Sequence, residues 1–127
     1  MKYLIVALLW VLTPIVIVAQ NNYHLSKVSV YFWEEPQKQY VLFETRDCNL
    51  TLYSSESFFS INNELKSSFS TKKKIFDEVT DLVDFVAWSA ENETKKPCTI
   101  KMLLYKKETR LEFQVVFVDI MIVYRIN

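Results

Sequence analysis

The 127-residue chain contains no glycine. Phosphate-binding loops, dinucleotide-binding turns and nucleophile elbows all need a residue without a side chain where the backbone turns sharply or touches a ligand. The absence argues against the enzyme classes that depend on those loops. Turns with a positive φ must use asparagine or aspartate instead, and we expect them at residues 47–49, 62–63 and 91–92.

Histidine and an excess of either charge are also scarce. The chain has one histidine, His24, and its 15 Lys and Arg residues balance its 15 Asp and Glu residues. Nucleic acids and anionic membranes attract proteins with a basic excess, so we expect no nucleic-acid partner. No HExxH or CxxC spacing occurs, and the sequence therefore predicts neither a metal site nor a cofactor.

The first nineteen residues have the parts of a secretory signal peptide. Lys2 precedes an apolar stretch at 3–19, and a polar run follows from Gln20. This order predicts cleavage after Ala19, which leaves residues 20–127 as a single secreted or periplasmic domain. The stretch also reaches the lower length limit for a membrane-spanning helix, so an uncleaved N-terminal anchor is the alternative, and only then would the membrane be a partner.

Two cysteines, Cys48 and Cys98, remain in the exported part. An even number of cysteines in an oxidising compartment favours a disulfide bond. The alternative is two independent buried thiols. A catalytic cysteine would need a nearby base, and His24 lies in the polar segment just after the export signal.

The hydrophobic spacing predicts an α+β fold. Alternating residues indicate strands at 26–33, 39–45 and 50–53, at 98–107, and in a final run that reaches residue 126. Apolar residues at helical spacing indicate a short helix beginning near residue 55 and a longer one at 75–90. The order β-β-β-α-α-β-β predicts an antiparallel or mixed sheet of about five strands with two helices packed on one face.

Two groups of residues are candidates for partner binding. Tyr31, Trp33, Tyr40 and Tyr53 could line one face of the sheet, either as a binding platform or as core beneath the helices. In the predicted second helix, Asp84 and Trp88 lie one turn apart on the polar face. A tryptophan there indicates either cover by another element or a contact surface.

Asp119 is the one charged residue in the apolar run 115–124. A buried carboxylate at this position would be a candidate acid or base, whereas a solvent-facing position or a basic partner would explain it without a function. Asn49 and Asn92 each begin an Asn-X-Thr sequon and are candidate glycosylation sites in a eukaryotic host.

These observations favour a small exported module that binds a protein or a small molecule and has no enzymatic activity. A membrane-anchored accessory subunit that retains residues 3–19 is the alternative. A small hydrolase or isomerase using Asp119 is a further alternative, but no second acid, histidine or serine is tied to Asp119 by a recognisable spacing.

Overall fold

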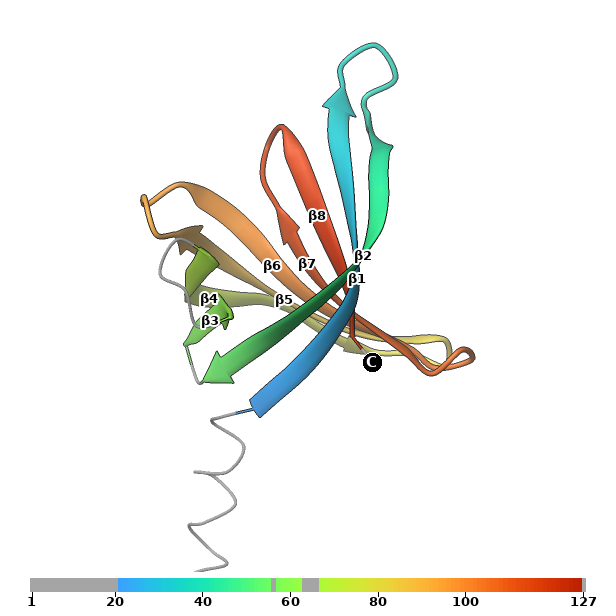
Figure 1. Ribbon diagram of the computed structural model, residues 1–127, viewed down its shortest axis with the longest axis vertical. Coiled ribbons are helices and arrows are strands. Elements are labelled where there is room, and N and C mark those ends of the chain that lie inside the picture. The colour runs from blue at the N-terminus through green and yellow to red at the C-terminus, as the bar shows by residue number, and fades with distance from the viewer. Residues whose placement is uncertain (1–20, 56, 63–66, 127) are drawn as a thin grey trace, which may run out of the picture.

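A computed structural model describes residues 21–55, 57–62 and 67–126, and within these residues the protein is built from eight strands and no α-helix. The strands are β1 (Asn21–Glu34), β2 (Gln39–Ser55), β3 (Phe58–Ile61), β4 (Ser68–Val79), β5 (Val83–Asn92), β6 (Pro97–Tyr105), β7 (Arg110–Val116) and β8 (Ile120–Ile126). Each strand pairs antiparallel with the next, and β8 pairs with β1, so the sheet closes into an up-and-down barrel (Figure 1). The expected signal peptide or anchor at 1–19 lies outside the described residues. The described part of the chain contains no helix of the length and hydropathy needed to cross a membrane.

The α+β prediction is wrong, and the segment 75–90 shows the reason most clearly. This stretch forms the end of β4, a turn and most of β5. Its valines and aromatic residues favour strands, although their spacing also fits a helix. The turn uses Thr80: its amide and hydroxyl donate to the Val83 carbonyl at 3.0 and 2.7 Å, and its hydroxyl accepts from the Val83 amide at 2.9 Å. A threonine thus replaces the glycine or asparagine that usually marks a hairpin in a sequence.

The shorter predicted helix, which begins near residue 55, is wrong for a similar reason. Of the residues on its predicted apolar face, Ile61 of β3 and Phe69 of β4 are buried in the barrel core, Phe58 of β3 is exposed, and Leu65 lies outside the described residues. The turn expected at 47–49 is also wrong, because β2 runs through these residues with an irregularity in its pairing to β1. The strand expected at 26–33 is confirmed as part of β1, the segments expected at 39–45 and 50–53 belong to the single strand β2, and the strand expected at 98–107 is confirmed as β6 up to Tyr105.

Side chains fill the middle of the barrel. Five are fully buried: Leu25, Leu52, Ile100, Phe113 and Val115. The Phe59 ring lies between the rings of Phe113 and Trp88, with centroid distances of 5.3 and 5.4 Å. Burying each large side chain stabilises the fold by about 1.5–3 kcal/mol, so this layer holds the barrel closed.

The barrel wall is uneven because β3 has only four residues. The β2–β3 ladder begins at Leu52, with the next contact at Thr51, and the β3–β4 ladder ends at Ser70. Among the described residues, residues 39–50 of β2 therefore pair only with β1, and residues 72–79 of β4 pair only with β5. Figure 1 shows the β1–β2 hairpin extending far beyond β3.

The predicted disulfide is absent: Cys48 and Cys98 are both free thiols. Cys48 lies on β2 and Cys98 on β6, four strands apart in either direction around the barrel. The Cys48 thiol instead donates a weak hydrogen bond to the Leu25 carbonyl at 3.5 Å. The disulfide prediction rests only on an even number of cysteines and an oxidising compartment, and the closed barrel keeps the two cysteines apart.

Candidate functional site: an uncharged outer face

A row of apolar side chains crosses four strands on the outside of the barrel. Val116 of β7 lies opposite Met121 of β8, Met121 opposite Tyr31 of β1, and Tyr31 opposite Leu42 of β2. The preceding residue Val115 is fully buried in the core, so alternation along β7 directs Val116 outward. Leu42 is 52% exposed, and the other three are half-buried.

Two aromatic residues extend this row toward the tip of the β1–β2 hairpin. Trp33 lies opposite Tyr40, and their rings meet edge to face with centroids 5.1 Å apart. The Trp33 indole Nε1 donates to a Glu35 carboxylate oxygen at 2.7 Å, and the Tyr40 hydroxyl donates to the carbonyl of Phe117. Desolvation, with a smaller contribution from the charge of Asp119, raises the Tyr40 pKa. The hairpin is thus tied to the β7–β8 turn, which fixes the orientation of its aromatic residues.

A second, polar but uncharged row follows. Gln114, Val123, Ser29 and Thr45 lie opposite one another in the same four strands. The hydroxyls of Ser29 and Thr45 are hydrogen-bonded at 2.9 Å. We call the two rows together the neutral face. Its members are Ser29, Tyr31, Trp33, Tyr40, Leu42, Thr45, Gln114, Val116, Met121 and Val123.

A charged row borders the neutral face. Glu112 lies opposite Arg125, Arg125 opposite Lys27, and Lys27 opposite Asp47. Lys27 Nζ lies 2.8 Å from an Asp47 carboxylate oxygen, and this hydrogen bond lowers the Asp47 pKa. The charges along this border are therefore two central cations, Arg125 and Lys27, flanked by two acids, Glu112 and Asp47.

Three of the four predicted aromatic residues, Tyr31, Trp33 and Tyr40, lie together on the neutral face. Tyr53 does not join them, because it lies near the other end of β2, opposite Asn22 and Ser60. The sequence reasoning missed Leu42, Val116 and Met121. Only the register in which β7, β8, β1 and β2 pair brings these residues into one row, so no local sequence pattern reveals them.

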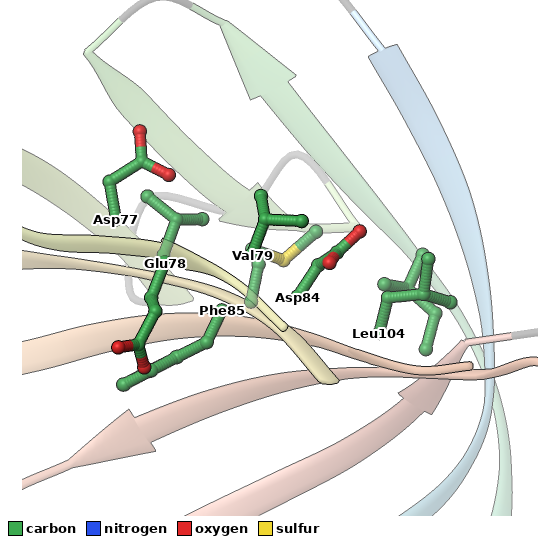
Figure 2. A pocket seen from close by; sticks show the side chains of 9 residues that line it. Asp77, Glu78, Val79, Asp84, Phe85 and Leu104 are labelled. Atoms are coloured by element: carbon green, nitrogen blue, oxygen red, sulfur yellow. The ribbon is translucent and has the colours of Figure 1, made fainter. Parts of the chain in front are cut away.

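Trp88 is half-buried and packs against the barrel core, where its ring contacts that of Phe59. Asp84 lies apart from it, at the wall of a small cavity of about 200 Å³ near the opposite end of the barrel from the β1–β2 hairpin. In Figure 2, Asp77 and Val79 point to one side of the strands, and Glu78 and Phe85 point to the other. The two predicted helix-face residues therefore do not form one site.

Lysines neutralise two of the cavity's carboxylates. Asp84 Oδ1 lies 3.0 Å from Lys106 Nζ, and Asp77 Oδ2 lies 3.2 Å from Lys74 Nζ. Val86, Met102, Leu104 and Leu111 supply apolar walls. Each of these two acids therefore already has a cationic partner. Within the described residues no group of three His, Cys, Asp or Glu side chains is placed to hold a metal ion.

Asp119 lies in the turn between β7 and β8, and its side chain is 73% exposed. Lys96 Nζ lies 3.7 Å from its carboxylate. A solvent-facing turn with a basic partner explains this carboxylate without a catalytic role. It is not the buried acid that the surrounding apolar run suggested.

Neither thiol has the low pKa of a nucleophilic cysteine. Burial, with a smaller contribution from Glu91, raises the Cys98 pKa to about 11. Burial also raises the Cys48 pKa. Both groups stay protonated near neutral pH, and a thiol is a poor nucleophile compared with a thiolate.

The two sequon asparagines differ in their surroundings. Asn49 is exposed on β2, and its side-chain oxygen lies 2.8 Å from His24 Nε2. Asn92 ends β5, and its side-chain oxygen accepts hydrogen bonds from the Thr94 amide and hydroxyl and from the Lys96 amide, at 2.9–3.0 Å. Asn92 thus shapes the β5–β6 turn whether or not it is modified.

Comparison with protein-family models, with curated proteins and with solved structures finds no match to this chain.

Proposed function

We propose that the protein is a small exported binding module, without enzymatic activity, that recognises a protein partner through the neutral face. The observation that carries this proposal is the distribution of charge across β7, β8, β1 and β2: two uncharged rows bordered by a charged one. An uncharged, partly aromatic centre with a charged rim is the usual anatomy of a protein interface.

The residue types support a protein partner. Tryptophan and tyrosine are enriched among the residues that dominate binding energy, and Trp33, Tyr31 and Tyr40 lie together on the face. Tyr40 and Trp33 are held by hydrogen bonds to Phe117 and Glu35, so little side-chain freedom is lost on binding. The balance of basic and acidic residues favours neither a nucleic acid nor an anionic surface.

Site-specific photocrosslinking in the producing cells tests this proposal. A photoreactive amino acid at position 31 or 121 is expected to give discrete protein adducts, and the same group at the exposed Lys107 is expected to give none. Trp33→Ala should reduce the adducts. Phe58→Ala is the matched control, because Phe58 and Trp33 are almost equally exposed, at 38% and 37%.

Absence of adducts at both positions of the neutral face, or equal labelling from position 107, would contradict the proposal. Equal loss of adducts in Trp33→Ala and Phe58→Ala would also contradict it, because the effect would then not belong to this face.

The alternative role, an accessory subunit of a membrane complex, rests on the apolar stretch 3–19. It predicts that the chain retains these residues and stays in the membrane fraction after carbonate extraction. Intact mass decides between the two roles: a chain that begins at Gln20 supports the exported module, and one that begins at Met1 supports the anchor.

A further inference from the structure

We define the open edge of β2 as residues 39–50. This stretch pairs with β1 on one side and with no described residue on the other, and it is the longest such stretch in the described sheet. An unpaired edge presents backbone amides and carbonyls to another strand. Its exposed apolar side chains include Val41, Leu42 and Phe43, and Phe43 is 67% exposed. This edge is suited to strand addition.

The charges on the open edge of β2 are self-complementary. Glu44 and Arg46 lie opposite Val30 and Val28 of β1, and Val28 is buried in the barrel, so both point to the inner side of the sheet. Their side chains approach to 3.7 Å within the chain. Thr45 lies between them in the strand and points to the outside of the barrel. It is close to the midpoint of the open edge of β2.

We propose that two copies of this chain form a dimer in which their β2 edges pair antiparallel about a two-fold axis at Thr45. In this register Glu44 of each copy lies opposite Arg46 of the other, because an axis at Thr45 exchanges the residues on either side of it. An axis near the midpoint also pairs the greatest length of the open edge, and so it forms the most backbone hydrogen bonds.

The second open edge, residues 72–79 of β4, is a poorer surface for a second copy. It begins with Lys72, Lys73 and Lys74. Lysines on an edge strand are a device that keeps it from pairing. The open edge of β2 has no such run of like charges, which favours it as the interface.

The dimer goes beyond the proposed partner recognition, since it uses the edge of the sheet rather than the outward side chains of β7, β8 and β1. It would place two neutral faces on one continuous sheet and so offer a partner two linked contacts. Crosslinks from positions 31 and 121 report the neutral face, and self-association reports the β2 edge, so the two proposals fail separately.

Sedimentation velocity of the protein, purified as the cell processes it and kept reduced, tests the dimer from about 1 to 200 µM. The wild-type protein should dimerise in this range. Glu44→Arg and Arg46→Glu should each weaken self-association by about tenfold or more, because each brings like charges together twice in the symmetric interface.

Mixing these two variants is the decisive measurement. One carries two arginines at positions 44 and 46 and the other carries two glutamates, so a mixed dimer has complementary charges while neither chain keeps its internal Glu44–Arg46 contact. The mixture should dimerise to within about threefold of the wild type. Circular dichroism confirms that each variant is folded.

Glu78→Arg on the open edge of β4 is the matched control and should leave self-association unchanged. A wild-type protein that stays monomeric at about 200 µM would overturn the proposal. So would a mixture that associates no better than its components, or a Glu78→Arg variant that dissociates the dimer.

Discussion

Trp33 and Tyr40 face each other across the β1–β2 hairpin, with ring centroids 5.1 Å apart and planes inclined by 71°. Edge-to-face aromatic pairs contribute about 0.5–1.5 kcal/mol beyond the area that they bury. The hydroxyl of Tyr40 adds a bond to the Phe117 carbonyl in the β7–β8 turn. One side chain therefore joins the hairpin to a turn that lies 77 residues away in sequence.

Removing only that hydroxyl tests its contribution. Tyr40→Phe keeps the ring contact with Trp33 but leaves the Phe117 carbonyl without this donor, and we expect a loss of about 1 kcal/mol in the free energy of unfolding. Urea denaturation followed by tryptophan fluorescence measures the change. Tyr53→Phe, at an exposed tyrosine of the same strand, should change stability by less than about 0.5 kcal/mol. Equal effects in the two variants would show that the Phe117 contact contributes nothing.

In the part of the chain that the structure describes, four residues adopt a positive φ without glycine: Lys38, Asn62, Lys95 and Thr109 have φ of 53°, 55°, 69° and 54°. Asn62 lies where the sequence predicts an asparagine turn. The sequence does not predict a positive φ at the two lysines or at the threonine. A β-branched residue is the least suited of these to a positive φ. Thr109, in the β6–β7 turn, therefore stores the most strain.

Replacing Thr109 by glycine should relieve this strain. We expect Thr109→Gly to raise the free energy of unfolding by about 0.5–1 kcal/mol, since glycine adopts this φ without a steric cost but loses more entropy on folding. Thr80→Gly is the opposite control: it removes the two hydroxyl contacts to Val83 and should lower stability by about 1–2 kcal/mol. Calorimetry shows whether each variant is more stable or less stable than the wild-type protein. A destabilised Thr109→Gly variant would refute the strain argument.

The sequence predicted the strands whose inner and outer residues alternate, because alternation is a local property. It failed at 75–90, where valine and aromatic residues fit both periods and Thr80 replaces the usual turn residues. The neutral face could be predicted only in part. Tyr31 and Trp33 share a strand, but Met121 and Val116 reach them through pairing between residues about 90 positions apart. Such register is fixed by barrel closure, which no local pattern encodes.

Asn92 provides a test of turn design. Its side-chain oxygen accepts from two backbone amides and one hydroxyl in the β5–β6 turn. Asn92→Ala leaves those amides to water, and we expect a loss of about 1–2 kcal/mol. Asn49→Ala removes the other sequon asparagine, which is exposed and contacts His24, and should cost less. Denaturation of the two unglycosylated variants compares them, and a larger loss for Asn49→Ala would contradict the role given to Asn92.

The Cys98 thiol should be protected from alkylation in the folded protein. Burial raises its pKa to about 11, so about one thiol in a thousand is ionised at pH 8. A thiol reagent at pH 8 should therefore modify Cys98 far more slowly in buffer than in denaturant. Mass spectrometry of the peptide that contains Cys98 follows the reaction. Equal rates in buffer and in denaturant would show that the thiol is accessible and easily ionised.

The same pKa makes stability depend on pH. The unfolded thiol ionises near pH 9 and the folded thiol near pH 11, so between these values the unfolded state loses its proton first and becomes favoured. The stability that the protonated Cys98 thiol contributes is fully present below pH 9. As the pH rises toward 11, the free energy of unfolding falls by up to about 3 kcal/mol. Burial also raises the Tyr124 pKa to about 12, which adds a similar loss at higher pH. Cys98→Ala should reduce the slope between pH 9 and 11 without removing it, because burial also raises the pKa of Cys48 and of Tyr124. If Cys98→Ala keeps the full slope in that window, another group must cause it.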